Sequence, residues 1–442
     1  MEVVMKRAIS TRSAFVILVL ASAAAFTAAP ACTARADDWP QFLGPSRNNV
    51  SAEKDLLSQF PDGGPKVLWS AKLGPGFAAP AVAGGKVYML DRDGRKGDVL
   101  RCWDLVTGKQ DWTFAYDAPG ALQYDGSRST PAVEGNSVFT VGAFGQVHCL
   151  DAKTHEVVWK ADLQKDFGVR LPNWGFSQSP LLYKDTIILS PQGKGAGVVA
   201  LEKTTGKVVW KTRQYGVTCY DSPMLAMIDG NETVLSIAAV SNTVSNVSGI
   251  DPEKGTILWS YKGWGRMFPI PGPVDLGGGR ILLSAEYGAS IAMIQVKRAE
   301  GDANVYKVEE VFNLSKTTTM ASQLHQPFLI KDHLYFVSNG FDRADGLVCM
   351  DLAGKVVWKT GKAPNFDLGG SILADDKLYL LDGKPGDLRI VQPDPAGYKQ
   401  LASAKVLQKG QMWGPLVISD GKLLVRDQET LKCLDIRAAG AK

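Results

Sequence analysis

Short apolar runs broken by turns recur along the whole chain. Two examples are Lys86–Leu90 and Ser137–Val141, which are rich in β-branched and aromatic residues and are flanked by Gly, Asn or Asp. Runs of this length and composition predict strands. Helical periodicity is essentially absent, so the pattern predicts an all-β fold.

The strands belong to an internal repeat. Each copy has an apolar strand ending at Asp or Glu, a turn that usually contains Thr-Gly-Lys, and a β-branched strand running into Trp. Gly in this turn supplies a positive φ. Successive closing Trp residues lie 47, 51 and 49 residues apart. The copies span residues 104–112, 151–159, 202–210 and 251–259, with a shortened copy at 351–358.

Each repeat also has an earlier strand, and before that an opening that is usually headed by Pro. This makes four strands in about 45–50 residues, which is typical of a propeller blade. The openings predict blades that begin near Pro80, Pro131, Pro180, Pro223, Pro273, Pro327, Gly370 and Pro415.

The last unit lacks a closing Trp strand, but an unassigned one, Pro65–Ser70 with Trp69, precedes the first opening. A ring must hide its sheet edges. We therefore expect an eight-bladed β-propeller of four-stranded blades whose N-terminal strand closes the last blade. Seven blades are the alternative, because the units near Phe312 and Leu401 are degraded.

The N-terminus has the features of a secretory signal peptide, predicted over residues 1–36. Lys6, Arg7 and Arg12 precede an uncharged apolar stretch (14–26), and Ala34-Arg35-Ala36 offers a small-x-small cleavage site. A retained anchor is the alternative, although the apolar stretch is short for a spanning helix. Cys32 raises lipoprotein processing, but the large aliphatic residue expected three positions upstream is missing. The prediction is therefore a periplasmic or secreted protein.

The predicted domains follow from these assignments. After the signal peptide come an N-terminal extension (37–64), a single propeller (65–436) and a short tail (437–442). The formal net charge is +4. Residues 1–36 hold four basic groups and one acidic group, which leaves +1 for the rest. A near-neutral chain has no electrostatic footprint for nucleic acid or for an anionic membrane.

The repeat resembles that of PQQ-like (pyrroloquinoline-quinone-like) β-propellers over most of residues 65–436. The segment Asp38-Trp39-Pro40-Gln41-Phe42-Leu43-Gly44-Pro45 is similar to an N-terminal motif of exported bacterial members. The resemblance implies two kinds of function. Quinoprotein dehydrogenases bind PQQ and calcium, whereas BamB-like scaffolds of outer-membrane assembly bind neither. Because both functions occur on this fold, the fold alone does not distinguish between them.

The repeated Trp residues are interpreted as structural, because the resemblance places this position between blades. The expected blade-docking set is Trp69, Trp112, Trp159, Trp210, Trp259 and Trp358. Four Cys residues sit two positions before the repeat Asp, where they should be buried and too far apart for disulfides. The adjacent Cys pair typical of the resembling dehydrogenases is missing.

The candidate binding residues come from topology. Loops entering the innermost strands should ring one mouth of the central channel, and here they mix aromatic with polar residues. The alternative is that the loops only cap the channel. The candidates are Arg128, Trp174, Tyr220, Asp221, Arg266, His325, Asp367 and Trp413. His325 can equally be structural. We predict no catalytic and no metal-binding residue, because the sequence shows no Glu/Asn/Asp calcium set and no haem motif.

These observations predict a non-catalytic exported propeller that binds a protein or polymer in the cell envelope. The expected partner is an envelope protein or an extracellular polymer, and a monomer without cofactor is expected. The first alternative is a PQQ-dependent alcohol or sugar dehydrogenase that holds PQQ and calcium. The second is a small-molecule or glycan binder at the channel mouth.

Overall fold

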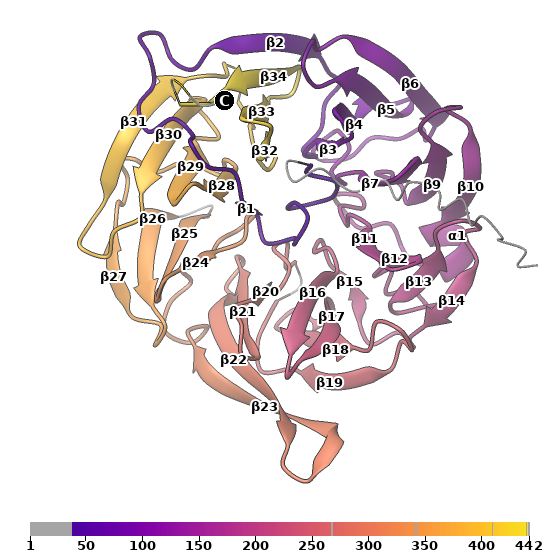
Figure 1. Ribbon diagram of the computed structural model, residues 1–442. Coiled ribbons are helices and arrows are strands. Elements are labelled where there is room, and N and C mark those ends of the chain that lie inside the picture. Colours follow the sequence, from indigo (N-terminus) through magenta and orange to yellow (C-terminus); the bar gives the residue numbers. More distant parts are fainter. Residues whose placement is uncertain (1–37, 267, 341–342, 409, 439, 441–442) are drawn as a thin grey trace, which may run out of the picture. The chain divides into compact units, whose positions relative to one another are not determined.

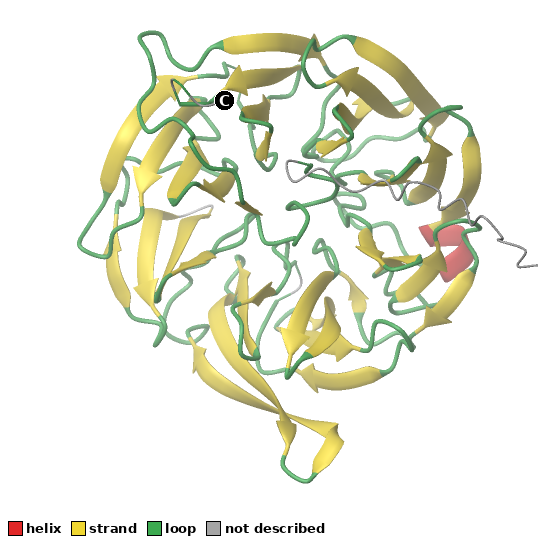
Figure 2. Ribbon diagram, in the orientation of Figure 1, coloured by secondary structure: helices red, strands yellow, loops and turns green. Residues whose placement is uncertain are grey.

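The computed structural model describes residues 38–442 except residues 267, 341–342, 409, 439 and 441–442. The predicted signal peptide lies outside the described residues. In the described part of the chain the eight sheets stand around a common centre (Figures 1 and 2). The one helix found there is the short α1 (Leu163–Phe167), which Asp162 caps through the amides of Gln164 and Lys165. The chain is an eight-bladed β-propeller.

The first four blades follow the chain from the inner to the outer strand. Blade 1 is β3 (Ala81–Ala83), β4 (Lys86–Asp93), β5 (Gly97–Asp104) and β6 (Gln110–Asp117). Blade 2 is β7 (Ala132–Glu134), β8 (Ser137–Val141), β9 (Gln146–Asp151) and β10 (Val157–Asp162). Blade 3 is β11 (Leu181–Tyr183), β12 (Thr186–Leu189), β13 (Val199–Glu202) and β14 (Val208–Lys211). Blade 4 is β16 (Met224–Ile228), β17 (Asn231–Ser241), β18 (Val244–Ile250) and β19 (Ile257–Tyr261), with β15 (Val217–Thr218) added beside β17.

The remaining blades repeat this order. Blade 5 is β20 (Val274–Asp275), β21 (Arg280–Ala285), β22 (Ser290–Ala299) and β23 (Asp302–Asn313), and its long outer hairpin projects from the ring (Figure 1). Blade 6 is β24 (Phe328–Ile330), β25 (His333–Gly340), β26 (Arg343–Asp351) and β27 (Val356–Lys359). Blade 7 is β28 (Ser371–Ala374), β29 (Lys377–Leu381), β30 (Asp387–Gln392) and β31 (Lys399–Lys405). Blade 8 is β32 (Val417–Ser419), β33 (Lys422–Arg426), β34 (Thr430–Asp435) and the N-terminal β2 (Val67–Lys72).

Blade 8 confirms the predicted closure of the ring. The strand β2 pairs antiparallel with β34, and Trp69 lies opposite Cys433. The two ends of the propeller therefore share one sheet. This pairing covers an edge that would otherwise be exposed, and the alternative of seven blades is wrong.

The repeat residues dock neighbouring blades. The indole N–H of Trp159 in blade 2 donates to the Lys203 carbonyl in the turn of blade 3, at 2.8 Å. Trp69 and Trp210 make the corresponding bonds to the next blade. The repeat Asp shapes each turn: Asp104 Oδ1 accepts from the Thr107 amide at 2.9 Å, as expected of an Asx turn. In blade 2 the turn Gly is replaced by His155, which has φ 63° and stacks on Trp112.

Residues 38–57, here called the N-terminal strap, cross the centre of the ring (Figure 1). Trp39 exchanges two backbone hydrogen bonds with Val82, the middle residue of β3. Arg47 then donates to the Pro180 carbonyl before blade 3, at 2.8 Å. Finally β1 (Val50–Ser51) runs parallel to β28. The strap therefore lies across the channel, against the inner strands.

The predicted interpretation of the cysteines is confirmed. Cys102, Cys149, Cys219, Cys349 and Cys433 are free and buried. The first, second, fourth and fifth lie at equivalent places in separate blades, packed in the apolar layers between sheets. Burial raises the pKa of Cys149 to about 11, so these thiols are protonated at neutral pH.

Candidate functional site

The channel mouth opposite the strap is a cup of about 390 Å³. Its wall comes mainly from the loops that enter the inner strands, as the topology predicted. Seven aromatic side chains line it: Phe42, Phe77, Tyr124, Trp174, Tyr220, Tyr287 and Trp413. Phe42 belongs to the strap, which thus contributes one side chain to the floor of the cup.

The aromatic side chains form one connected cluster. Trp174 lies at its middle and contacts Tyr124, Tyr220 and Tyr287, with ring centroids 6.4, 4.8 and 6.0 Å away. Trp413 stacks on Phe77 at 5.4 Å and 22°. Such pairs add stability beyond the area they bury. All of these rings except the buried Tyr220 are only partly buried, so the cluster retains surface for a ligand.

Arg128 is the cation of the cup wall. Its Nη1 donates to the Gly126 carbonyl at 2.6 Å, its Nη2 donates to the Tyr124 carbonyl, and its guanidinium lies 5.4 Å over the Phe77 ring. Burial lowers the pKa of Arg128 to about 10, so it stays charged at neutral pH. Gly126 has φ 121°, and a β-carbon there would collide with Gly76. The close approach of these two loops therefore sets where Arg128 lies.

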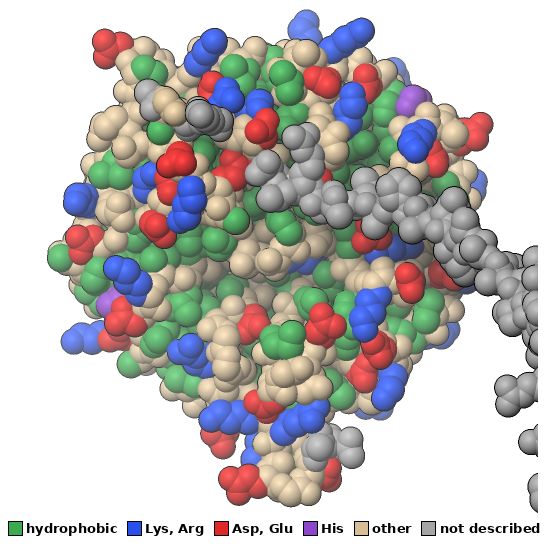
Figure 3. Space-filling model, in the orientation of Figure 1, with side chains coloured by type: hydrophobic (Ala, Val, Ile, Leu, Met, Phe, Trp, Pro, Cys, Tyr) green, Lys and Arg blue, Asp and Glu red, His purple; other side chains and the backbone are tan. Residues whose placement is uncertain are grey.

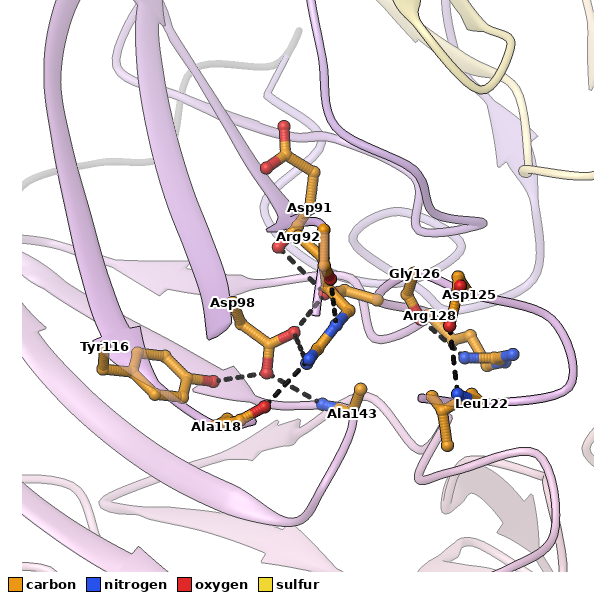
Figure 4. A network of polar contacts seen from close by, with 12 residues as sticks. Asp91, Arg92, Asp98, Tyr116, Ala118, Leu122, Asp125, Gly126, Arg128 and Ala143 are labelled. Carbon is orange, nitrogen blue, oxygen red and sulfur yellow. Dashed lines mark hydrogen bonds and ion pairs between the residues drawn. The ribbon is translucent and has the colours of Figure 1, made fainter. Parts of the chain in front are cut away.

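A buried polar network anchors the Arg128 loop (Figure 4). Asp98 accepts from Arg92 Nη1 at 2.9 Å, from the Tyr116 hydroxyl at 3.0 Å and from the Ser127 hydroxyl at 2.6 Å. Its second oxygen also accepts from the Ala143 amide at 3.1 Å. Because Ser127 precedes Arg128, this ion pair ties the loop to blades 1 and 2. The Arg92 and Asp98 side chains are 1% and 0% exposed.

Asp367 is the carboxylate of the cup wall. The Trp413 indole N–H donates to its Oδ2 at 3.2 Å. Its backbone is held by Asn365 and Asn339, which bond its amide and its carbonyl. Asp367 has φ 47°, a conformation that Asp tolerates better than most residues. The Trp413–Asp367 contact joins the loops before blades 7 and 8.

His325 lines the cup, but its ring is engaged in a hydrogen bond with the backbone of a neighbouring loop. Its Nε2 lies 3.2 Å from the Leu368 carbonyl. Burial lowers the pKa of His325 to about 4, so the ring is neutral at pH 7 and its Nε2 donates this bond. This environment fits a structural role for His325, which the sequence left open beside a binding role.

Two of the eight candidate residues lie away from the cup wall. Asp221 is buried behind Tyr220, and its Oδ2 accepts from the Ile237 amide at 3.2 Å. Burial raises the pKa of Asp221 to about 8. Arg266 lies beside Gly288, and its carbonyl accepts from the Ser245 hydroxyl. The other six candidates, namely Arg128, Trp174, Tyr220, His325, Asp367 and Trp413, come together in the cup.

Four aromatic members of the wall were not among the candidate residues. Tyr124 lies in the same loop as the candidate Arg128. Phe77 lies just before the opening at Pro80, so the rule applied to the other blades would have found it. Tyr287 lies in the turn between β21 and β22, where the repeat carries no signal. Phe42 reaches the cup from the strap, and only the folded path of the chain reveals this.

The cup residues do not fit the calcium and quinone site that the resemblance implies. In the described part of the chain, no group of three or more His, Cys, Asp or Glu side chains could hold a metal ion. Asp367 is the only carboxylate on the cup wall. Asn339 Oδ1 already accepts from the Gly346 amide. Calcium requires six to eight oxygen ligands in one cage, and these side chains do not provide it.

The surface around the ring carries both signs of charge. In the face shown in Figure 3, Lys and Arg are interspersed with Asp and Glu, and neither sign gathers into one patch. This agrees with the near-neutral charge of residues 37–442. Among the described residues, no helix is long and apolar enough to cross a membrane.

In a comparison with known families, residues 95–360 match a family model. The matching family is described as "Outer membrane protein assembly factor BamB". The matched segment begins in blade 1 and extends just beyond the outer strand of blade 6, so it contains most of the repeats found in the sequence.

Curated relatives match over a shorter region. The quinoprotein alcohol dehydrogenase PedH of Pseudomonas putida is 24% identical over 166 residues, which are 37% of this chain and 27% of that protein. The quinoprotein ethanol dehydrogenase of Pseudomonas aeruginosa is 26% identical over 156 residues, 34% of this chain and 24% of that protein. The matches thus span about a quarter of each relative.

Solved structures show the same fold. BamB from Moraxella catarrhalis aligns with a TM-score of 0.56 and 14% identity, covering 84% of this chain and 100% of that chain. The quinohemoprotein alcohol dehydrogenase from Comamonas testosteroni aligns with a TM-score of 0.62 and 13% identity, covering 92% and 81%. At these identities the likeness concerns the fold alone.

Proposed function

The chain belongs to the family described as outer membrane protein assembly factor BamB, and from this premise we propose that it is a non-catalytic binding module of the cell envelope. Its ligand is a group on an envelope protein or an extracellular polymer, held in the aromatic cup. The protein reaches the envelope by export through its N-terminal signal sequence.

The observation that carries this proposal is the aromatic cup. A concave site lined by aromatic side chains with a few fixed polar groups is the usual form of a ligand site. Here seven rings surround one cation and one carboxylate. Asp367 and Arg128 are both fixed by neighbouring groups, so the cup is organised before any ligand arrives.

The competing function is a quinoprotein dehydrogenase, which the partial match to PedH favours. Such an enzyme needs a base beside the substrate carbon. Asp367 is the one carboxylate among the described residues of the wall, and it lies there without the further carboxylates that a calcium ion beside the quinone would need. The buried Asp221 lies outside the cup. The arrangement of side chains therefore supports binding better than oxidation.

The test is titration of the protein lacking residues 1–36, followed by intrinsic Trp fluorescence. The probes are PQQ with calcium, a set of short peptides and a set of oligosaccharides. Trp413→Ala removes a wall residue, and Trp264→Phe is the control, since Trp264 is buried and donates to the Ser290 carbonyl.

The proposal expects a saturable signal with a peptide or an oligosaccharide, lost in Trp413→Ala and kept in Trp264→Phe. Saturable binding of PQQ with calcium, accompanied by dye-linked oxidation of an alcohol, would overturn it and make the protein a small quinoprotein.

A further inference from the structure

Arg128 and Tyr220 supply hydrogen-bond donors to the cup. The Arg128 guanidinium has five N–H groups, and two of them satisfy backbone carbonyls. The Tyr220 oxygen accepts from the Trp174 amide at 3.3 Å, which leaves its O–H to donate. Burial raises the pKa of Tyr220, and the nearby Arg128 guanidinium opposes that effect. Both groups also line the same cup, so one ligand group in the cup could contact them together.

Arg128 makes no ion pair with a carboxylate among the described residues, although it is partly buried in the wall. Its side chain contacts two carbonyls and the face of Phe77, and the carboxylates of Asp125 and Asp98 act on its pKa without a direct contact. A partly buried cation that no carboxylate contacts is incompletely compensated. An anionic ligand group would supply the missing charge, and a carboxylate matches the planar fork of a guanidinium.

Asp367 supplies the acceptor on the wall. Its Oδ2 takes the Trp413 indole N–H, and a carboxylate accepts further hydrogen bonds from hydroxyl groups. The surrounding rings present apolar, electron-rich faces. C–H groups of a saturated ring pack well on such faces. The cup therefore combines a site for an anion, a site for hydroxyls and a surface for a ring.

We propose that the cup binds a carboxylate-bearing sugar ring, a uronate unit of an acidic polysaccharide. Arg128 and the Tyr220 hydroxyl bind its carboxylate, Asp367 accepts from its hydroxyls, and the ring packs on the aromatic cluster around Trp174. This inference rests on the proposed function and specifies the ligand of that site.

A peptide fits the cup less well. Peptides that bind by strand addition need a free strand edge for their amides, and unpaired buried amides are costly. The strap already pairs with the inner edges of β3 and β28. The wall above them is made mainly of side chains, and a sugar ring has no backbone amides to satisfy.

The strap limits how the polymer enters. Phe42 forms part of the floor, backed by Arg47, whose guanidinium lies 5.6 Å from its ring. Because the strap crosses the centre of the ring (Figure 1), a polymer that threaded through the propeller would meet it. The cup therefore accepts the end of a polysaccharide or a side branch, and a short oligosaccharide is a sufficient probe.

The experiment is calorimetric titration of the protein lacking residues 1–36 with digalacturonate at pH 7 and low salt. The neutral disaccharide galactobiose and a tripeptide with a free carboxylate are the comparison probes. Digalacturonate should bind saturably and at least ~10-fold more tightly than galactobiose, because charge-assisted hydrogen bonds are about twice as strong as neutral ones.

Three variants assign the contacts. Arg128→Lys keeps the positive charge but removes the planar guanidinium that can donate two parallel hydrogen bonds to a carboxylate. The preference for digalacturonate over galactobiose should therefore fall by ~10-fold. Tyr220→Phe removes one hydroxyl without disturbing the Arg128 loop, and affinity should fall by ~3–10-fold. The exposed Arg213→Gln should bind as the unaltered protein does. Tyr220→Phe keeps the test valid if Arg128→Lys fails to fold.

Equal binding of galactobiose, or full affinity in Tyr220→Phe, would overturn the uronate proposal and leave the binding function standing. Tight binding of the tripeptide in place of digalacturonate would also overturn it. If no peptide or sugar probe binds, the proposed function fails as well, which is a separate result.

Discussion

The Trp159 indole of blade 2 lies directly against Gly206 in the turn of blade 3. A β-carbon on Gly206 would come within 2.6 Å of the indole ring, and Gly206 has φ 71°. The same contact joins Trp210 to Gly255, at 2.5 Å. The turn glycine of the repeat is therefore required twice, once for its backbone conformation and once for the space that the preceding blade's Trp occupies.

Gly206→Ala should destabilise the propeller by about 2–4 kcal/mol, since it combines a left-handed backbone cost with overpacking. Gly230→Ala is the matched control. Gly230 has φ 75° and no atom near the position that a β-carbon would take. The free energy of unfolding of this variant should therefore fall only by the cost of the left-handed backbone conformation, about 1 kcal/mol. Urea denaturation measures both. Equal losses would show that the Trp159 contact contributes nothing.

The indole N–H groups of two docking tryptophans have different environments. Trp210 donates to the Pro252 carbonyl at 2.9 Å, whereas the buried Trp259 N–H has no partner among the described residues. Trp210→Phe should therefore cost about 1 kcal/mol more than Trp259→Phe, because it leaves a carbonyl unsatisfied. Thermal unfolding of the two variants gives the comparison. A larger loss in Trp259→Phe would contradict it.

Asp98→Asn should be strongly destabilising, by about 3–5 kcal/mol, because it leaves the buried Arg92 without its counter-charge. The exposed pair of Lys96 and Asp93 is the control, with side chains 80% and 62% exposed. Asp93→Asn should change stability by no more than about 0.5 kcal/mol. Chemical denaturation decides between these values, and a small loss in Asp98→Asn would refute the anchoring role of the network.

The Asp221 carboxyl gives the protein a predictable pH dependence. Burial raises its pKa from 3.8 to about 8, so the folded state holds a proton that the unfolded state releases. Stability due to this group is present below about pH 4 and is lost as pH rises toward 8. His148 and His325 act in the opposite direction, because burial lowers the pKa of each to about 4.

Asp221→Asn should therefore flatten the fall in stability between pH 5 and 8, because the amide cannot ionise and its oxygen can still accept from the Ile237 amide. The measurement is the urea midpoint of both proteins at several pH values, taken as a difference so that the other titrating groups cancel. Parallel profiles would show that Asp221 is already ionised in the folded protein.

The repeat alone was enough to predict the eight blades and the closing strand, which was expected over Pro65–Ser70 and lies at Val67–Lys72. The reason is that each signal is short-range. Asp shapes a turn a few residues away, Gly permits that turn, and Trp reaches the next blade at a nearly constant spacing. The prediction of buried, unpaired cysteines succeeded for the same reason, since equivalent positions in different blades are far apart.

Only the tertiary structure decided which loop residues form the cup. Asp221 and Arg128 both lie in loops that enter inner strands, yet Asp221 turns inward behind Tyr220 while Arg128 lines the wall. The strap was equally hidden, because Phe42 and Arg47 meet the propeller through residues more than a hundred positions away. Loop conformation and long-range packing depend on many weak contacts at once and leave no periodic signal in the sequence. The repeated turns and strands do leave one, which is why the sequence determined the ring and the fold determined the cup.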